Sequence, residues 1–171
     1  PDEYKLIKGY LKSENFIDDN GMLTTSQKPL NVFARIASGA MPTHIAQEPL
    51  EHYQETFVIC NKPGGSAGHV FMTTKNLHWT YFNVLSIVMN GYVSFLEDMK
   101  DAAHMFAASR GWVNIGCYFH CFPHTNVNSL HLHIVNLDDI NCKQTYKNLS
   151  MQDAIEMAKY VREINTVRCC R

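Results

Sequence analysis

The stretch NSLHLHIVNL, residues 128–137, places two histidines two positions apart within an alternation of polar and apolar side chains. Successive side chains of a β-strand face opposite sides of the sheet, so the alternation predicts that His131 and His133 share one face. Two residues advance a strand by roughly 6.6 Å, which lets both imidazoles touch one small anionic group such as a phosphate. The same alternation is typical of any half-buried antiparallel strand. The pattern alone therefore does not decide whether the two histidines form a functional pair or are ordinary polar residues of a strand.

The length and charge of the chain limit the classes of protein to which it can belong. With 171 residues and 19.5 kDa it has room for one domain with a sizeable core, and a second full domain is not expected. The 15 Lys and Arg residues nearly balance the 16 Asp and Glu residues, so the net charge is −1. We therefore expect no broad basic surface for nucleic acid or an anionic membrane, and any contact with phosphate has to be local.

The cysteine pattern and the lack of long apolar runs bear on the cellular compartment. The six cysteines show no spaced disulfide framework, and Cys60, Cys117 and Cys121 fall in stretches with the composition of strands. We therefore expect reduced thiols in a cytoplasmic or nuclear protein. No signal peptide opens the sequence and no run of about 18 apolar residues occurs, so no membrane association is expected.

Short runs of aromatic and β-branched residues predict an antiparallel sheet. Besides the histidine strand, residues 55–60, 69–74 and 112–122 have the composition of strands. The first two are joined by NKPGGSAG, residues 61–68, whose glycines allow the backbone to approach a ligand closely, with a plain surface hairpin as the alternative. The pair Asn-Gly within FIDDNGML, residues 16–23, predicts a further small hairpin.

Apolar residues at helical spacing predict helices over residues 3–12 and 31–42, over 79–110, and from Ser150 onward. The longest of these, 79–110, is expected to be one amphipathic helix that covers the sheet. Ser150 is followed three residues later by Asp153, which is close to a capping box. The elements together predict an α+β fold, with an antiparallel sheet and helices on one side of it.

Three motifs resemble one known family. SLHLHIV, residues 129–135, resembles the His-φ-His-φ-His-φ-φ motif of the histidine-triad (HIT) superfamily of nucleotide hydrolases and transferases, with φ apolar, at every position but the first. The pattern F-x-R-I-x-x-G-x-x-P at 33–42 resembles the opening helix of that superfamily, and PGGSAGHVFMTTKNLH at 63–78 resembles its Gly-His strand. Within the superfamily, FHCFPHTNVNSLHLHIVNL at 119–137 is most similar to the branch that holds aprataxin and the scavenger decapping enzymes.

The resemblance implies a fold and a domain organisation. A single HIT-like domain of the α+β class would span residues 1–171, with an antiparallel sheet packed by a long helix and a core over about 31–137. Residues 1–30 would form an N-terminal extension, and residues 138–171 a C-terminal helical extension. The resemblance also implies a homodimer.

The resemblance further implies roles for individual residues. His131 matches the histidine that attacks the α-phosphorus, His133 matches the last triad histidine beside the leaving group, and His69 matches a histidine near the triad. A neutral imidazole suits this attack because its unperturbed pKa is about 6.5, close to neutral pH. The nucleotide-binding residues implied in the same way are Asn114, Phe33, Ile36, Asn61, Pro63, Pro123 and Asn126.

Ser129 stands where the family has its first triad histidine, and this is the main departure from the motif. A hydroxyl group can form hydrogen bonds but cannot carry positive charge, so the change is expected to slow the chemistry without emptying the pocket. By position, His120, His124 and His69 are the candidates to supply the missing imidazole. We count Ser129 and His120 among the expected catalytic residues.

Two functions from different classes follow. The first is a nucleotide phosphohydrolase or nucleotidyl transferase that forms a covalent nucleotidyl-His131 intermediate on a small mono- or dinucleotide, with cap-like and adenylated substrates among the candidates. The second is a nucleotide-binding or interaction protein that keeps the fold with reduced or lost catalysis. No cofactor is expected for either.

A zinc site is the alternative chemistry for the same region. Cys117, His120, Cys121 and His124 offer zinc-type ligands close to the histidine strand. Side chains three residues apart on a regular strand face opposite sides, so Cys117 and His120 would point away from each other. We therefore expect no metal.

Overall fold

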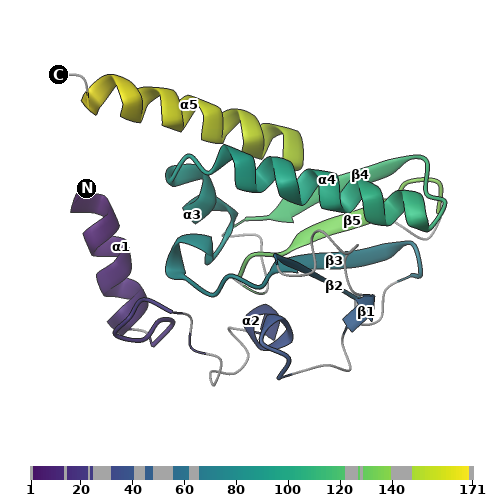
Figure 1. Cartoon of the computed structure of the whole chain (residues 1–171), viewed down its shortest axis with the longest axis horizontal. Helices are drawn as coiled ribbons and strands as arrows, with labels where there is room; N and C mark the ends of the chain where they lie inside the picture. The colour runs from purple at the N-terminus through teal and green to yellow at the C-terminus, as the bar shows by residue number, and fades with distance from the viewer. Residues whose placement is uncertain are drawn as a thin grey trace.

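The computed structural model of the chain describes residues 2–13, 15–22, 24, 32–40, 45–47, 56–61, 66–121, 127, 129–139 and 148–169. In this part of the chain, helices pack around an antiparallel sheet of six strands (Figure 1). The strands are β1 (Ile45–Gln47), β2 (Phe57–Asn61), β3 (His69–Thr74), β4 (Ile115–His120), β5 (Leu132–Asn136) and β6 (Asn148–Ser150). The helices are α1 (Asp2–Ser13), α2 (Val32–Ala37), α3 (Val84–Met89), α4 (Val93–Ser109) and α5 (Met151–Cys169), with a 3-10 turn η3 (Trp79–Tyr81).

The histidine strand β5 lies in the middle of the sheet. The strand order is β1-β2-β3-β5-β4-β6, so β5 pairs with β3 on one side and with β4 on the other. Leu132 and Ile134 are fully buried in the main core, as expected for the apolar face of the strand. The register places His133 opposite Phe71 of β3 and Tyr118 of β4. The predicted α+β class and the antiparallel sheet are therefore confirmed.

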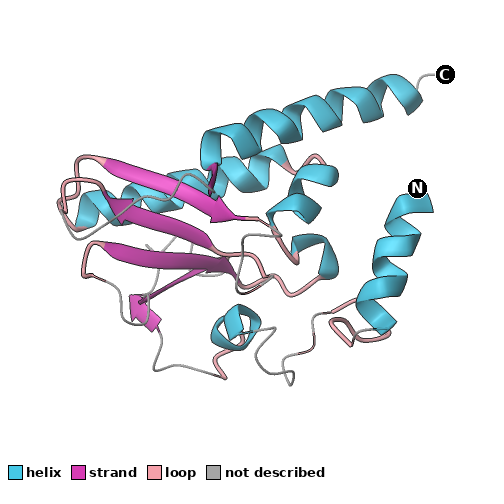
Figure 2. Cartoon of the chain, turned by 180° about the vertical axis from the view of Figure 1, so that it is seen from behind, coloured by secondary structure: helices cyan, strands magenta, loops and turns pink. Residues whose placement is uncertain are grey.

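Helices cover both faces of the sheet, and the expectation of helices on one side only was wrong. The helix α4 lies in front of the sheet in Figure 1 and behind it in Figure 2, where the chain is seen from behind. The short helix α2 packs against the other face, where Phe33 and Ile36 join a cluster with Val58, Cys60 and Phe71. This second layer forms because β2 and β3 carry apolar side chains on both faces, so neither face can be left to water.

The predicted single helix over 79–110 is in fact divided into η3, α3 and α4. The side chain of Asn83 accepts a hydrogen bond from the amide of Ser86 at 2.9 Å and so starts α3 as its N-cap. Gly91 follows α3 with φ of +64°, a conformation that ends a helix and that residues with a Cβ rarely adopt. The apolar spacing continues from α3 to α4 because both helices face the main core, whereas Trp79 of η3 packs in a separate cluster.

Residues 138–171 were expected to form a helical extension, but the described part of this segment also contains a strand. The strand β6 pairs with β4 at the sheet edge, with Ser150 opposite Tyr118 and Asn148 opposite His120. The helix α5 then begins at the predicted place. The Ser150 hydroxyl accepts from the amide of Asp153 at 3.0 Å and donates to its carboxylate at 2.7 Å, so the predicted N-cap at Ser150 is confirmed.

Replacing Ser150 by Ala is expected to lower the free energy of unfolding by about 1 kcal/mol, because α5 then loses its N-cap hydrogen bond. Urea unfolding followed by circular dichroism measures the change. Ser94→Ala is the matched control, because Ser94 is an exposed serine within α4. An equal and small effect in both variants would show that the cap does not stabilise α5.

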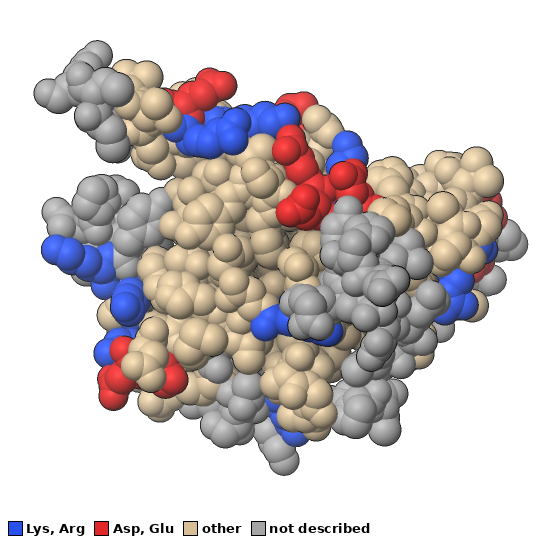
Figure 3. Space-filling model, viewed as in Figure 1, with Lys and Arg blue, Asp and Glu red and all other residues tan. Residues whose placement is uncertain are grey.

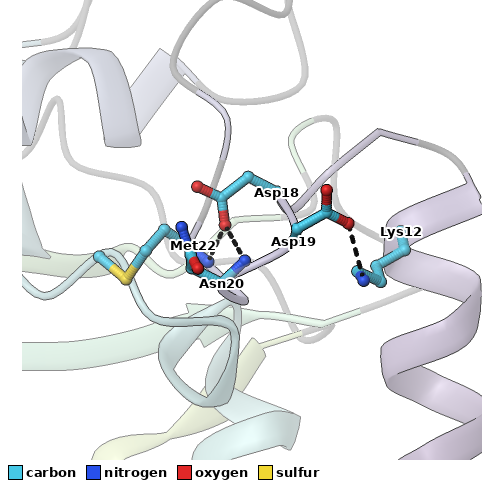
Figure 4. Close-up of polar contacts among 5 residues, drawn as sticks. All are labelled: Lys12, Asp18, Asp19, Asn20 and Met22. Atoms are coloured by element: carbon cyan, nitrogen blue, oxygen red, sulfur yellow. Dashed lines mark hydrogen bonds and ion pairs between the residues drawn. The ribbon is translucent and has the colours of Figure 1, made fainter.

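The N-terminal helix docks on a separate apolar cluster. Leu11, Phe16 and Ile17 pack with Trp79 and Phe82. The chain after α1 turns at Asp18, whose carboxylate accepts from the amides of Asn20 (2.8 Å) and Met22 (2.9 Å), while Lys12 pairs with Asp19 at 3.0 Å (Figure 4). The predicted Asn20-Gly21 turn closes a small hairpin, in which the amide of Asp18 donates to the Met22 carbonyl oxygen at 2.8 Å and the amide of Thr24 donates to the Phe16 carbonyl oxygen at 2.9 Å. Met22 also bridges to His78.

The face of the molecule seen in Figure 3 carries mixed charge, with acidic side chains of α4 beside basic side chains of α5. Lys159 of α5 pairs with Glu97 of α4 at 3.1 Å. Among the described helices, none combines the length and the apolar character needed to cross a membrane.

Candidate active site

Three neighbouring strands bring four histidines together on the face of the sheet opposite α4. His69 begins β3, His120 ends β4, His133 lies within β5, and His131 directly precedes β5. The ring centroids of His131 and His133 are 5.1 Å apart, and His69 lies at 5.1 Å from His133. We call these four residues the histidine cluster. The period-2 alternation predicted that His131 and His133 share a face, and the structure places both rings there.

His131 is held in one orientation by the backbone. Its Nδ1 lies 2.7 Å from the carbonyl oxygen of Ser129, and the side chain is buried, with 6% exposed. Because a carbonyl oxygen only accepts, Nδ1 carries the ring proton and donates it, which leaves the lone pair on Nε2. The pKa of His131 is lowered to about 4, mainly because the ring is buried; the hydrogen bond to Ser129 opposes this shift, and the nearby His120 adds a smaller lowering effect. The ring is therefore neutral near pH 7.

His133 and His69 form a second polar pair within the cluster. Nδ1 of His133 and Nε2 of His69 lie 2.9 Å apart, so the two rings share one hydrogen bond whose donor depends on their tautomers. His133 is as buried as His131, whereas His69 is partly exposed. The pair links β3 to β5, and the ring centroid of His133 lies 5.1 Å from that of His131.

His120 approaches both triad histidines from β4. Its ring centroid lies 4.1 Å from that of His133 and 6.3 Å from that of His131. Phe119 pairs with Leu132, so the register brings the next residue of β4 beside His131. Of the three histidines considered as replacements for the missing imidazole, His120 and His69 lie in the cluster, and His124 lies outside the described residues.

The carbonyl of Ser129 is the contact that sequence reasoning missed. Ser129 is buried, and its backbone, not its side chain, provides the acceptor for His131. No residue type signals this contact, because every residue carries the same carbonyl group. The sequence could at most have shown that residue 129 is near His131.

Aromatic rings cover the nucleophile candidate. The ring of Phe33 stacks on His131 with centroids 4.4 Å apart and an angle of 11°, and Phe71 meets both His131 and His133 edge-on. Phe71 was not among the predicted site residues. Its place two residues after His69 on the same strand was the available signal, since such residues share a face.

The other predicted nucleotide-binding residues are dispersed. Ile36 is buried in the cluster with Val58 and Cys60, and Asn61 is exposed at the end of β2. Asn114 is exposed and donates to the carboxylate of Asp138 at 3.2 Å, at the end of β4 away from His120. Three further residues lie outside the described part of the chain: Pro63, Pro123 and Asn126.

The cysteines of the described chain take no part in the cluster. The metal-ligand atoms that converge there belong to His120, His131 and His133, and neither Cys117 nor Cys121 joins them in the described residues. Both cysteines pack against the main core instead. Cys60 and Cys117 form no disulfide, and burial raises the pKa of each to about 12, so both remain thiols.

Comparisons with known proteins support the fold. No family model matches the sequence, and no curated protein does either. Among solved structures, the chain is similar to a HIT family hydrolase from Clostridium thermocellum, at 19% identity and a TM-score of 0.52, over 70% of this chain and 100% of that chain.

Two further structures are similar at lower TM-scores. A Hit-like protein from Bartonella henselae involved in cell-cycle regulation shows 15% identity and a TM-score of 0.48 over 80% of this chain and 97% of its own. The aprataxin ortholog Hnt3, in complex with DNA, shows 22% identity and a TM-score of 0.46 over 64% of this chain and 60% of its own. The predicted resemblance to the histidine-triad superfamily is confirmed at the level of the fold, which this chain shares with the Clostridium thermocellum hydrolase.

Proposed function

We propose that this chain is a nucleotide phosphohydrolase or nucleotidyl transferase that acts through a covalent nucleotidyl-His131 intermediate. The observation that carries the proposal is the 2.7 Å contact between Nδ1 of His131 and the Ser129 carbonyl oxygen. This contact selects the tautomer whose Nε2 lone pair is available for attack. An imidazole that is neutral and held by a fixed acceptor meets the requirements for a histidine nucleophile.

The reaction then has two steps. Nε2 of His131 attacks the α-phosphorus, and the new N–P bond forms as the bond from phosphorus to the leaving group breaks. The leaving group departs with that electron pair and takes up a proton. In the second step, water or another acceptor attacks phosphorus, the N–P bond breaks, its electron pair returns to Nε2, and the acceptor releases a proton.

The neighbouring histidines supply the charge that this chemistry needs. A protonated ring beside the phosphoryl oxygens stabilises their developing charge and can protonate the leaving group. His133 and His69 share a hydrogen bond at 2.9 Å, and His120 lies 4.1 Å from His133 between ring centroids. We expect these rings to contact the phosphate that His131 attacks. We assign to His120 the charge that Ser129 cannot carry.

The substrate class that fits this site is a small mono- or dinucleotide with an ester, anhydride or phosphoramidate link at its α-phosphate. A net charge of −1 disfavours recognition of a long polyanion by a broad basic surface. Recognition is then local, by the rings of the histidine cluster.

A nucleotide-binding protein without turnover is the second candidate, and one observation favours it. The Phe33 ring stacks on His131 at 4.4 Å, and only 6% of His131 is exposed. In-line attack on phosphorus needs an open approach to Nε2, and a residue as buried as His131 offers little room for one. A protein that only binds a nucleotide needs no such approach, so the stacked Phe33 and His131 rings are compatible with it.

Trapping the intermediate tests the first function against the second. The full chain, freed of metal with a chelator, is mixed rapidly with an adenylate or guanylate ester carrying a good leaving group and quenched in base. Intact mass spectrometry is expected to show one nucleotidyl group per chain, and peptide mapping to place it on His131. Tight nucleotide binding without an adduct would support the binding protein.

Replacing Ser129 by Ala is expected to leave adduct formation within a few fold of the parent, because the orienting acceptor is the backbone carbonyl. Rapid-quench rates for the two proteins measure the effect. A loss of about 100-fold or more, as is usual for a group that assists proton transfer, would instead assign the chemistry to the Ser129 hydroxyl.

A further inference from the structure

We propose that His120, His131 and His133 form a binding site for a divalent transition-metal ion of the Zn²⁺ type, and that the bound ion blocks the nucleophile. The metal site stands on the geometry of the three rings. Its inhibitory effect rests on the proposed function, because it assumes that His131 is the nucleophile.

The three rings converge from two adjacent strands. One nitrogen from each of His120, His131 and His133 lies within 4.8 Å of the other two. Nitrogen ligands on one tetrahedral zinc ion stand about 2.0–2.1 Å from the metal and therefore about 3.4 Å from each other. The three rings need to close by little more than about 1 Å, and the ring that closes in from the neighbouring strand belongs to His120, which is half-buried in the last position of β4.

Two of the three rings are already held as metal-ligating histidines usually are. Such a histidine donates its second ring nitrogen to a carbonyl, carboxylate or similar acceptor, which fixes the tautomer and aims the ligand atom. Nδ1 of His131 donates to the Ser129 carbonyl at 2.7 Å. Nδ1 of His133 lies 2.9 Å from Nε2 of His69, so His69 acts as the outer partner. With His133 as the donor of that hydrogen bond, both His131 and His133 present Nε2 to the metal.

The ligand types decide which ion fits. Three imidazoles suit zinc and its first-row neighbours, whereas Mg²⁺ and Ca²⁺ prefer oxygen ligands. The described group holds no cysteine and no carboxylate, so three ligands leave a fourth position open, as in zinc sites that bind water or a substrate oxygen.

Metal binding and nucleophilic attack compete for the same electrons. Nε2 of His131 has one lone pair, which it can give either to a metal ion or to phosphorus. One bound ion per chain should therefore prevent formation of the nucleotidyl adduct, and a chelator should restore it. The site would make the activity sensitive to free zinc.

The test uses the full chain, freed of metal, with Zn²⁺ alone in calorimetry and Co²⁺ alone in visible absorption. We expect one ion per chain, with the absorption bands of tetrahedral cobalt and without a sulfur-to-cobalt charge-transfer band. His120→Gln is expected to weaken Zn²⁺ binding by about 100-fold or more, and His69→Gln by about 10-fold or more. His104→Gln, which changes an exposed histidine of α4, is the matched control and should bind as the parent does.

Equal Zn²⁺ affinity in the parent, His120→Gln and His69→Gln would overturn the site, as would a sulfur charge-transfer band that accounts for all bound cobalt. Circular dichroism verifies that each variant is folded. If one of the two variants does not fold, the other is enough to test the site. Failure of the proposed function is distinguishable, because calorimetry needs no nucleotide. If the metal-free chain forms no adduct but binds Zn²⁺ through His120, the site stands and the nucleotidyl intermediate does not.

Discussion

His131→Asn is expected to lower nucleotide turnover by about 1,000-fold or more, because the variant loses the nucleophilic nitrogen. The Asn amide keeps a donor near the position of Nδ1, so the hydrogen bond to the Ser129 carbonyl can persist and the local fold is retained. Steady-state kcat/KM on a nucleotide ester with a chromogenic leaving group measures the effect.

His104→Asn is the control for this substitution, since His104 is exposed on α4 and should leave turnover unchanged. Thermal unfolding of both variants separates lost chemistry from lost structure. If folded His131→Asn retained more than about a tenth of the activity, His131 could not be the nucleophile.

Leu132→Ala is expected to lower the free energy of unfolding by about 2–5 kcal/mol, because it leaves a cavity in the middle of the core. Leu132 has no exposed surface and belongs to the central strand, where it packs between the helices and the neighbouring strands. A loss of this size is a large part of the total stability of a typical domain, about 5–15 kcal/mol. Urea unfolding monitored by circular dichroism gives the value.

Leu85→Ala is the matched control, because the same deletion on the surface of α3 removes a side chain that is 36% exposed. Its effect is expected to stay within about 0.5 kcal/mol, as for most surface substitutions. Similar losses for the two leucines would contradict the placement of β5 in the centre of the core.

The local signals in the sequence were sufficient for several elements. The strand β3 has the predicted bounds, 69–74, because a run of β-branched and aromatic residues is bounded there by glycine and by polar residues. The start of α5 was also predictable, since Ser150 and Asp153 form a cap from side chains three residues apart. Signals of this kind act over a few residues and need no partner elsewhere in the chain.

Elements that depend on distant partners were not predictable. The three-residue strands β1 and β6 form only because β2 and β4 offer them a free edge. The sequence did not reveal the breaks before and after α3, because apolar residues keep their helical spacing on either side of them. The breaks themselves come from the Asn83 cap and from the left-handed Gly91. The position of α2 on the far face depends on which side of the sheet α4 leaves open.

The sequence by itself determined that His131 and His133 share one face of a strand, because the period of two is a property of the extended backbone. It also determined that Leu132 and Ile134 belong to the core. Only the tertiary structure decided what surrounds the two rings: His120 by strand register, His69 by a hydrogen bond to His133, the Ser129 carbonyl at Nδ1 of His131, and Phe33 stacked above it. These contacts join strands and a helix that are far apart in the chain, so they depend on how the sheet pairs and packs, and not on any local pattern of residues.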